Sequence, residues 1–271
     1  MRMEVRWSAD NVDLTRAFAK ELVDLQPDVI LASNTPATAA LQLETRMIPI
    51  VFQLVSDPVG EGFIASVSRP GGNITGLINA EASLAGKWLE LLTEIAPGIK
   101  RAAIMFNPDT ASGGGSYHLT AFDAAARSLQ VVPITAPVHS DAEIETVITS
   151  LGRQPGGGLV VMPDGGFMTV HRAAVILVAA RNNVSAVYIV SDFARDGDLL
   201  SGPDLGDTYH RAAIYVDRIL RGEKPGDLPV QFPTKFEMVV NRKTATALIS
   251  LTAREHIRCN RDGSFQWRTL L

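Results

Sequence analysis

Short, fully apolar segments alternate with amphipathic helical segments along most of this 271-residue chain, and no other feature restricts its fold as much. Each apolar run is bounded by proline, glycine or polar residues, as expected for strands that are buried on both faces of a sheet. Each helical segment carries its apolar residues on one face. This alternation predicts βαβ units, and therefore an α/β fold built on parallel sheets.

The predicted elements follow one another in strict order. Helices are expected at 11–25, from Thr35 with Pro36 in the first turn, and at 83–96, 117–129, 141–152, 170–183 and 207–222. Strands are expected at 27–33, 48–54, 101–107, 131–138, 158–164 and 186–190. Extended chain is expected at 229–241. Polar, glycine-bearing segments at 69–73 and 192–204 interrupt the series. Both are interpreted as crossovers between two separate sheets.

Charge and composition exclude several classes of function. The net charge of −4 and the pI near 5.8 provide no basic field for a phosphate backbone, so no nucleic-acid partner is expected. The single cysteine, Cys259, cannot form an intramolecular disulfide or complete a cysteine-based metal site. We expect no metal and no cofactor. Residues 1–10 lack the pattern of a secretory signal, which leaves a cytosolic protein or numbering that starts inside a longer precursor.

Polar loops that follow the predicted strands are the best candidates for a binding site. Ligands of open parallel sheets bind outside the carboxyl ends of the strands, where helix N-termini present free N–H groups. Five loops of this kind, at 33–37, 53–60, 107–117, 163–166 and 191–197, are expected to face one another across a cleft. The candidate ligand-binding residues in them are Ser33, Asn34, Thr35, Gln53, Asp57, Asn107, Ser112, Ser116, Asp164 and Phe193.

Most of these residues have a structural alternative. The cluster at 33–35 precedes a helix, so it could cap that helix, hold a carboxylate, or do both. Asp57 and Asp164 are either turn residues or partners for a ligand ammonium group. Asn107 precedes a proline and is a turn former first and a ligand amide second. Phe193 either stacks on a ligand or packs in a hinge.

Catalytic motifs are absent from the sequence, and we expect a protein that is not an enzyme. The glycine-rich segment at 112–117 lacks the Lys-Ser/Thr ending of a phosphate loop. No G-x-S-x-G elbow or H-E-x-x-H pattern occurs, and the five histidines are scattered, so we expect them to be surface or hydrogen-bonded side chains. An α/β enzyme acting on a phosphorylated substrate is therefore the weakest alternative.

Four long segments resemble a known family. PDVILASNTPATAAL, IPIVFQLVSDPVGEGFIASVSRPGGNITG, GKWLELLTEIAPGIKRAAIMFNPDT and YVDRILRGEKPGDLPVQFPTKFEMVVNRKTA are similar to the ABC transporter substrate-binding family that includes tryptophan and tyrosine binders. The likeness extends from about Val5 to about Leu248. It implies a type I periplasmic-binding-protein fold, in which two Rossmann-like lobes close on a small polar solute, with an amino acid as one candidate.

The resemblance also implies partners and boundaries. The expected partners are a solute and the membrane permease of an ABC transporter, for a monomer located in the periplasm or anchored outside the cytoplasm. The expected N-terminal lobe comprises 1–76 and about 198–225. The expected C-terminal lobe comprises 77–197 and about 226–250, and an atypical tail follows at 251–271. A ligand-sensing regulator with the same fold is the main alternative, although neither end of the chain contains a basic helix-turn-helix segment.

Two segments depart from the family pattern. The chain would start at the family's second strand, MRMEVRW, without the first strand and helix of the N-terminal lobe. That strand would be central in its sheet, so unpaired backbone groups and exposed apolar residues are expected beside the gap. The tail ISLTAREHIRCNRDGSFQWRTLL does not resemble the family's apolar C-terminal helix, and both a shifted reading frame and a divergent end would explain it.

Overall fold

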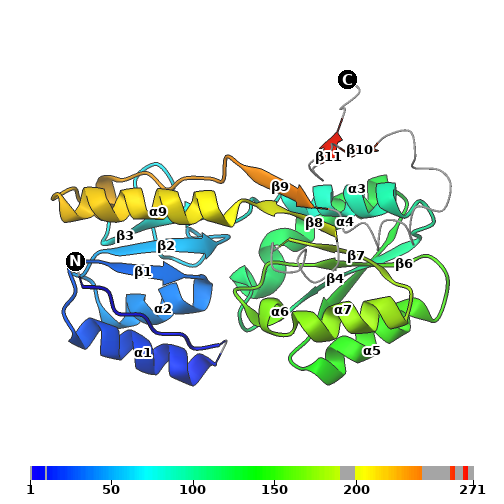
Figure 1. Cartoon of the computed structure of the whole chain (residues 1–271), viewed down its shortest axis with the longest axis horizontal. Helices are drawn as coiled ribbons and strands as arrows, with labels where there is room; N and C mark the ends of the chain where they lie inside the picture. Colours follow the sequence, from blue (N-terminus) through cyan, green and yellow to red (C-terminus); the bar gives the residue numbers. More distant parts are fainter. Residues whose placement is uncertain (1, 10, 190–198, 240–256, 260–264, 268–271) are drawn as a thin grey trace.

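Two α/β lobes stand side by side in the computed structural model, which describes residues 2–9, 11–189, 199–239, 257–259 and 265–267. Each lobe is built on its own sheet, and helices cover both faces of each sheet (Figure 1). Within these two sheets the strands pair in parallel except at one edge of the larger sheet. The predicted α/β class with two sheets is therefore confirmed.

The N-lobe contains a three-stranded parallel sheet in the order β1-β2-β3. The strands are Ile30–Ser33, Ile50–Val55 and Ile74–Ile78, and helices α1 (Val12–Asp24) and α2 (Thr35–Glu44) cover the face opposite α9 (Leu205–Leu220). Side chains of the central strand β2 are buried on both faces, with Phe52 in the core beneath α2 and Val51 in the core beneath α9. Burial on both faces explains why this strand is almost entirely apolar.

The C-lobe contains a six-stranded sheet in the order β5-β4-β6-β7-β8-β9. In chain order the strands are Arg101–Phe106 (β4), Val132–Pro137 (β5), Gly157–Val161 (β6), Ser185–Tyr188 (β7), Leu199–Pro203 (β8) and Phe236–Val239 (β9). Helices α3 (Leu84–Ile95) and α4 (Ser116–Ser128) cover one face, and α5 (Asp141–Gly152), α6 (Phe167–Val170) and α7 (Arg172–Arg181) cover the other.

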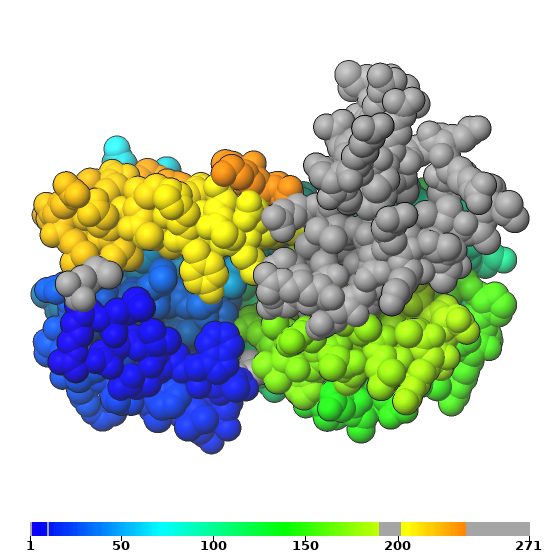
Figure 2. Space-filling model, viewed as in Figure 1, coloured from blue at the N-terminus to red at the C-terminus, as the bar shows by residue number. Residues whose placement is uncertain are grey.

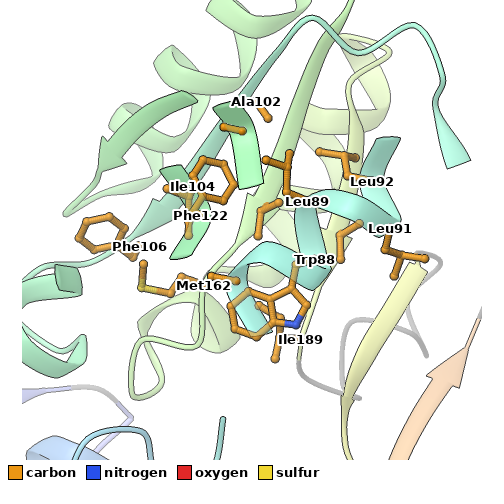
Figure 3. Packing of buried hydrophobic residues seen from close by; sticks show 14 of the residues in the cluster. Trp88, Leu89, Leu91, Leu92, Ala102, Ile104, Phe106, Phe122, Met162 and Ile189 are labelled. Carbon is orange, nitrogen blue, oxygen red and sulfur yellow. The ribbon is translucent and has the colours of Figure 1, made fainter. Parts of the chain in front are cut away.

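The core beneath α3 and α4 reaches the carboxyl edge of the C-lobe sheet (Figure 3). Trp88 and Phe106 are each 2% exposed and belong to this core. Met162 and Ile189, which follow β6 and β7 directly, belong to the same cluster. The end of this core therefore lies next to the loops that leave the sheet on the side of the predicted cleft.

In the described part of the chain, three connections join the lobes. The first is 79–83, between β3 and α3; the second is Asp204, between β8 and α9; the third is 232–235, which leads into β9. The prediction of a crossover at 69–73 is wrong, because the next segment, β3, pairs with β2 and the chain leaves the N-lobe only after it. Of the second predicted crossover, residues 192–198 lie outside the described part of the chain.

The lobe boundaries differ from the predicted ones because strand pairing overrides the local composition. Residues 199–203 were expected in the N-lobe, but β8 pairs with β7 in the larger sheet. Residues 228–231 were expected in the C-lobe, but Gln231 forms a parallel bridge with Leu77 of β3. The first lobe accordingly extends to the end of β3, two residues beyond the predicted boundary at 76.

Hydrogen bonds and ion pairs tie the second and third connections together. The N–H of Asp204 donates to the carbonyl of Lys235 over 3.0 Å. The ammonium group of Lys235 lies 2.6 Å from the carboxylate of Asp207, in the first turn of α9. Arg211, one turn further along, donates to the carbonyl of Phe232 over 3.0 Å. The two connections therefore form one bonded unit at the start of α9.

Both ends of the chain differ from the predicted family pattern. Residues 2–8 form no strand, and Met3, Val5 and Trp7 are strongly exposed. This segment instead follows α1, where Arg6 donates to the carboxylate of Glu21 over 3.1 Å. In the tail, Ile257–Cys259 (β10) and Phe265–Trp267 (β11) pair with each other in antiparallel fashion. No helix in the described part of the chain is long and apolar enough to cross a membrane.

Candidate functional site at the carboxyl ends of the strands

The loop between β1 and α2 supplies the first candidate residues. The side chain of Asn34 accepts the N–H of Ala37 over 2.9 Å and caps α2, so the capping alternative is confirmed for this residue. Asn34 itself has φ of 92°, which turns the chain sharply after the strand. Its backbone N–H donates to the carbonyl of Gln53 over 2.9 Å and fixes the loop against β2. Ser33 is half-buried and Thr35 is buried.

On the C-lobe, Asn107 and Asp164 join two neighbouring loops. The carboxylate of buried Asp164 accepts the backbone N–H of Asn107 over 3.0 Å and that of Met168 over 3.1 Å. The amide oxygen of Asn107 accepts the N–H of Asp109 over 2.8 Å and closes a turn. Both side chains therefore have a structural role in holding the loop ends in position, and a direct role toward a ligand stays a prediction for each.

The loops of the two lobes meet directly. The hydroxyls of Thr35 and Ser112 lie 3.2 Å apart, and both residues are buried. The carboxylate of Glu61, in the loop after β2, accepts the backbone N–H of Gly113 over 2.8 Å. In the space-filling view the two lobes touch beneath α9 (Figure 2). The predicted convergence of loop ends from two sheets is thus realised for the loops at 33–37 and 107–117, and Glu61, one residue beyond the predicted loop at 53–60, joins them.

The loop at 163–166 also reaches the opposite lobe. A Cβ atom added to Gly165 would lie 3.0 Å from Cδ of Pro36, across the cleft, and 2.8 Å from the carbonyl of Thr110 in its own lobe. Gly165 also has φ of 82°, a conformation that glycine adopts at no steric cost. A side chain here would therefore press on Pro36 of the N-lobe as well as on the backbone of its own lobe. Phe193, in the fifth predicted loop, lies outside the described residues.

Ser116 and Asp57 stand at the rim of this contact. Ser116 is exposed, and its hydroxyl donates to the carbonyl of Gly113 over 2.7 Å, within its own loop. One carboxylate oxygen of half-buried Asp57 accepts the N–H of Gly60 over 2.8 Å, which confirms its turn role. The pKa of Tyr117, on α4, is raised by its partial burial and then by the negative charge of Asp57. Asp57 therefore acts electrostatically on the opposite lobe.

Gln53 is the least satisfied of the predicted residues. Its side chain is fully buried, and neither the amide nitrogen nor the amide oxygen has a hydrogen-bond partner. A buried polar group without a partner costs about 1–3 kcal/mol. Residue 54, which follows it, has φ of 57° and breaks the register between β2 and β3. An unsatisfied amide beside a strained position at a strand end is typical of a binding site.

Three residues near the site were not among the sequence candidates. Glu61 and Tyr117 lie in or beside predicted loops, and the only available signal was an acidic or aromatic residue in a glycine-rich loop. His118 contradicts the expectation that the histidines are surface or hydrogen-bonded groups. It is 1% exposed, and neither ring nitrogen has a hydrogen-bond partner. The expectation does hold for His139 and His171, which pair with Glu143 and Asp141.

Comparison with known proteins identifies the family to which this architecture belongs. The family model for "ABC transporter substrate binding protein" matches residues 2–260. The chain belongs to this family. The solved relatives confirm the expected type I periplasmic-binding-protein fold. Membership of the family confirms the solute-binding role in transport. Its members are binding proteins rather than enzymes.

Relatives of this ABC transporter substrate-binding protein include amino-acid binders. A tyrosine-binding protein of Clostridioides difficile is 23% identical over 249 residues, which cover 92% of this chain and 70% of the relative. An ABC domain from Streptococcus pneumonia in complex with L-Trp has a TM-score of 0.78 at 21% identity, covering 88% of this chain and 81% of that one. A ligand-free, open substrate-binding protein from Clostridium difficile has a TM-score of 0.63 at 23% identity, covering 91% and 82%. Transcription regulators share the fold as well.

Proposed function

We propose that this substrate-binding protein binds an amino acid between its lobes and delivers it to the membrane permease of an ABC transporter. The observation that carries the proposal is the meeting of polar loop ends from two separate sheets, through the Thr35–Ser112 and Glu61–Gly113 contacts. Hinged closure of two lobes on a solute requires such opposed surfaces and few connections between them. The three connections of this fold satisfy that requirement.

An amino acid needs one site for its carboxylate and another for its ammonium group. Thr35 begins α2, and with Ser112 it offers two hydroxyls beside a helix N-terminus, an environment that favours an anion. Asp57 is the group assigned to the ammonium. Its Oδ1 atom is used by the Gly60 N–H, which leaves Oδ2 available as an acceptor. The names of two relatives, a tyrosine-binding protein and a domain bound to L-Trp, support an amino-acid ligand.

Gln53 is assigned to the same ligand. Its amide provides two donors and an acceptor in a fully buried position, with none of them used inside the protein. A solute, or a water molecule held by the solute, would remove the cost of this unsatisfied amide. The remaining candidates would then line the edge of the site and fix its shape rather than form its charged contacts. They are Ser33, Asn34, Asn107, Ser116 and Asp164.

Binding without turnover, as a monomer outside the cytoplasmic membrane, follows from this role. Among the described residues, no group of three or more His, Cys, Asp and Glu side chains could hold a metal ion. The closing motion itself would complete the site, because groups from both lobes have to surround the solute. The loaded, closed form is the one that the permease would recognise.

Calorimetric titration of the chain with each of the common amino acids tests this proposal. For at least one amino acid, the binding heat should saturate and fit one site per chain. Asp57→Asn keeps an oxygen for the Gly60 N–H but removes the charge, so the Kd should rise about 10- to 100-fold. Asp28→Asn, at an exposed position of the same lobe, is the matched control and should leave the Kd unchanged. Absence of heat with every amino acid would refute the proposal.

A further inference from the structure

His118 is a buried polar group that the proposed contacts to the amino-acid backbone do not use. The residue occupies the first turn of α4, directly after the loop that meets the N-lobe. Its ring is 1% exposed, and both ring nitrogens lack a hydrogen-bond partner. A polar contact with the Ala82 backbone falls outside hydrogen-bond geometry. A neutral imidazole in such a place has one donor and one acceptor to offer.

Two aromatic rings lie against this imidazole. The ring centroid of Trp88 lies 5.2 Å from that of His118, at an interplanar angle of 57°. The ring of Tyr117 lies 5.0 Å away in an edge-to-face arrangement at 76°. These distances fall in the range where aromatic pairs attract each other. A further flat ring would find the same kind of environment here.

This aromatic group lies at the end of the C-lobe core that faces the cleft. Trp88 packs in one cluster with Phe106, Met162 and Ile189, residues that end or directly follow strands β4, β6 and β7 (Figure 3). Ala82, whose backbone lies near His118, belongs to the first connection between the lobes. The imidazole is therefore close to both the strand ends and the hinge, where solutes bind in open parallel sheets.

Tyr117 links the group to the opposite lobe. Its ring is half-buried, and its pKa responds to the charge of Asp57 in the N-lobe. Asp57 is the residue assigned above to the ligand ammonium group. An amino acid anchored at Asp57 would therefore lie within the electrostatic reach of Tyr117. Of the two rings beside His118, Tyr117 is the more exposed, since Trp88 is buried.

We propose that His118 is a specificity-determining residue, which recognises a hydrogen-bonding group on the ring of an aromatic amino acid held beside Tyr117 and Trp88. The inference rests on the proposed amino-acid function. A phenol O–H or an indole N–H can donate to the free imidazole nitrogen, whereas a phenyl ring leaves that nitrogen buried and unpaired. A site built to bond a polar group rejects the analogue that lacks it. Tyrosine or tryptophan should therefore bind more tightly than phenylalanine.

Titrations with L-tyrosine, L-tryptophan and L-phenylalanine test this inference. In the unmodified chain, the better of the first two ligands should have a Kd at least about tenfold below that of L-phenylalanine, as one buried hydrogen bond provides. His118→Leu and His118→Phe remove the acceptor, so that ratio should fall to near one while L-phenylalanine binding is kept. His139→Leu, a change at a half-exposed histidine, should preserve the ratio. Thermal unfolding of each variant checks that it is folded.

The outcomes separate this inference from the proposed function. An unchanged ratio in folded His118 variants overturns the specificity role and leaves amino-acid binding intact. Equal affinity for the three ligands in the unmodified chain has the same consequence. Lack of binding to all amino acids overturns both proposals together. The use of two substitutions of different shape means that one variant that fails to fold does not prevent the comparison.

Discussion

Acid should weaken the folded state through His118, because burial disfavours the charged imidazolium. Burial lowers the pKa of His118 from 6.5 to about 4, and the contact with the Ala82 backbone opposes this only in part. Between these two values the unfolded chain binds a proton that the folded chain does not, so stability falls as the pH falls from 6.5 toward 4. Above pH 6.5 both states carry a neutral ring, and the effect vanishes.

The size of the effect follows from the two pKa values. Since one pKa unit corresponds to about 1.4 kcal/mol, the full loss amounts to about 3 kcal/mol below pH 4. About 2 kcal/mol of it should be lost between pH 7 and pH 5. This is a large part of the stability of an ordinary domain, which totals about 5–15 kcal/mol.

Urea unfolding at a series of pH values measures this quantity when the chain is compared with His118→Phe. The carboxylates titrate in both proteins, so the difference between their free energies of unfolding isolates the histidine. That difference should shift by about 2 kcal/mol in favour of the variant on going from pH 7 to pH 5. A difference that does not change with pH would refute the reasoning, since it would mean that the ring is hydrated or already paired in the folded state.

Two further predictions concern contact between the lobes. Glu61→Gln weakens the acceptor for the Gly113 N–H, so the ligand should dissociate faster and the Kd should rise about three- to tenfold. The control Glu94→Gln, at an exposed site, should change neither the dissociation rate nor the Kd. Stopped-flow dissociation measures this, and an unchanged rate would exclude Glu61 as a closing contact. Gly165→Ala places a Cβ against Thr110 and Pro36, so it should lower both Tm and affinity. The control Gly71→Ala has the same φ of 82°, but its added Cβ would have no neighbour nearer than 3.8 Å, so it should lower the Tm alone. Equal losses of affinity in Gly165→Ala and Gly71→Ala would contradict the steric argument.

Secondary structure was predictable wherever one periodicity dominated. The strand ending at Ser33 and the helix after it were recognised because an apolar run meets a capping residue and Pro36 at the first turn. The segment at 69–73 was misread because composition marks a turn but does not reveal whether the next strand joins the same sheet. Pairing of β3 with β2 decides that question, and it depends on contacts between residues distant in sequence.

The candidate site was predictable in its loops but not in its chemistry. Strand ends of a parallel sheet converge on one edge, so the loops that carry Thr35, Asp57 and Ser112 could be named in advance. Whether a polar side chain in such a loop is free is a property of its neighbours. Asp164 turned out to accept three backbone N–H groups, while His118, on a helix, has no hydrogen-bond partner at all. Local sequence contains no signal that separates these two cases.

Closure of the lobes around an amino acid is the central claim, and small-angle X-ray scattering with and without a saturating aromatic amino acid tests it most directly. The free chain should sample open forms through the three connections, so its radius of gyration should decrease when the solute is added. Glu61→Gln and Gly165→Ala should reduce that decrease. Calorimetric saturation with an unchanged radius of gyration would contradict the account, because the solute would then bind without bringing the two sets of loops together.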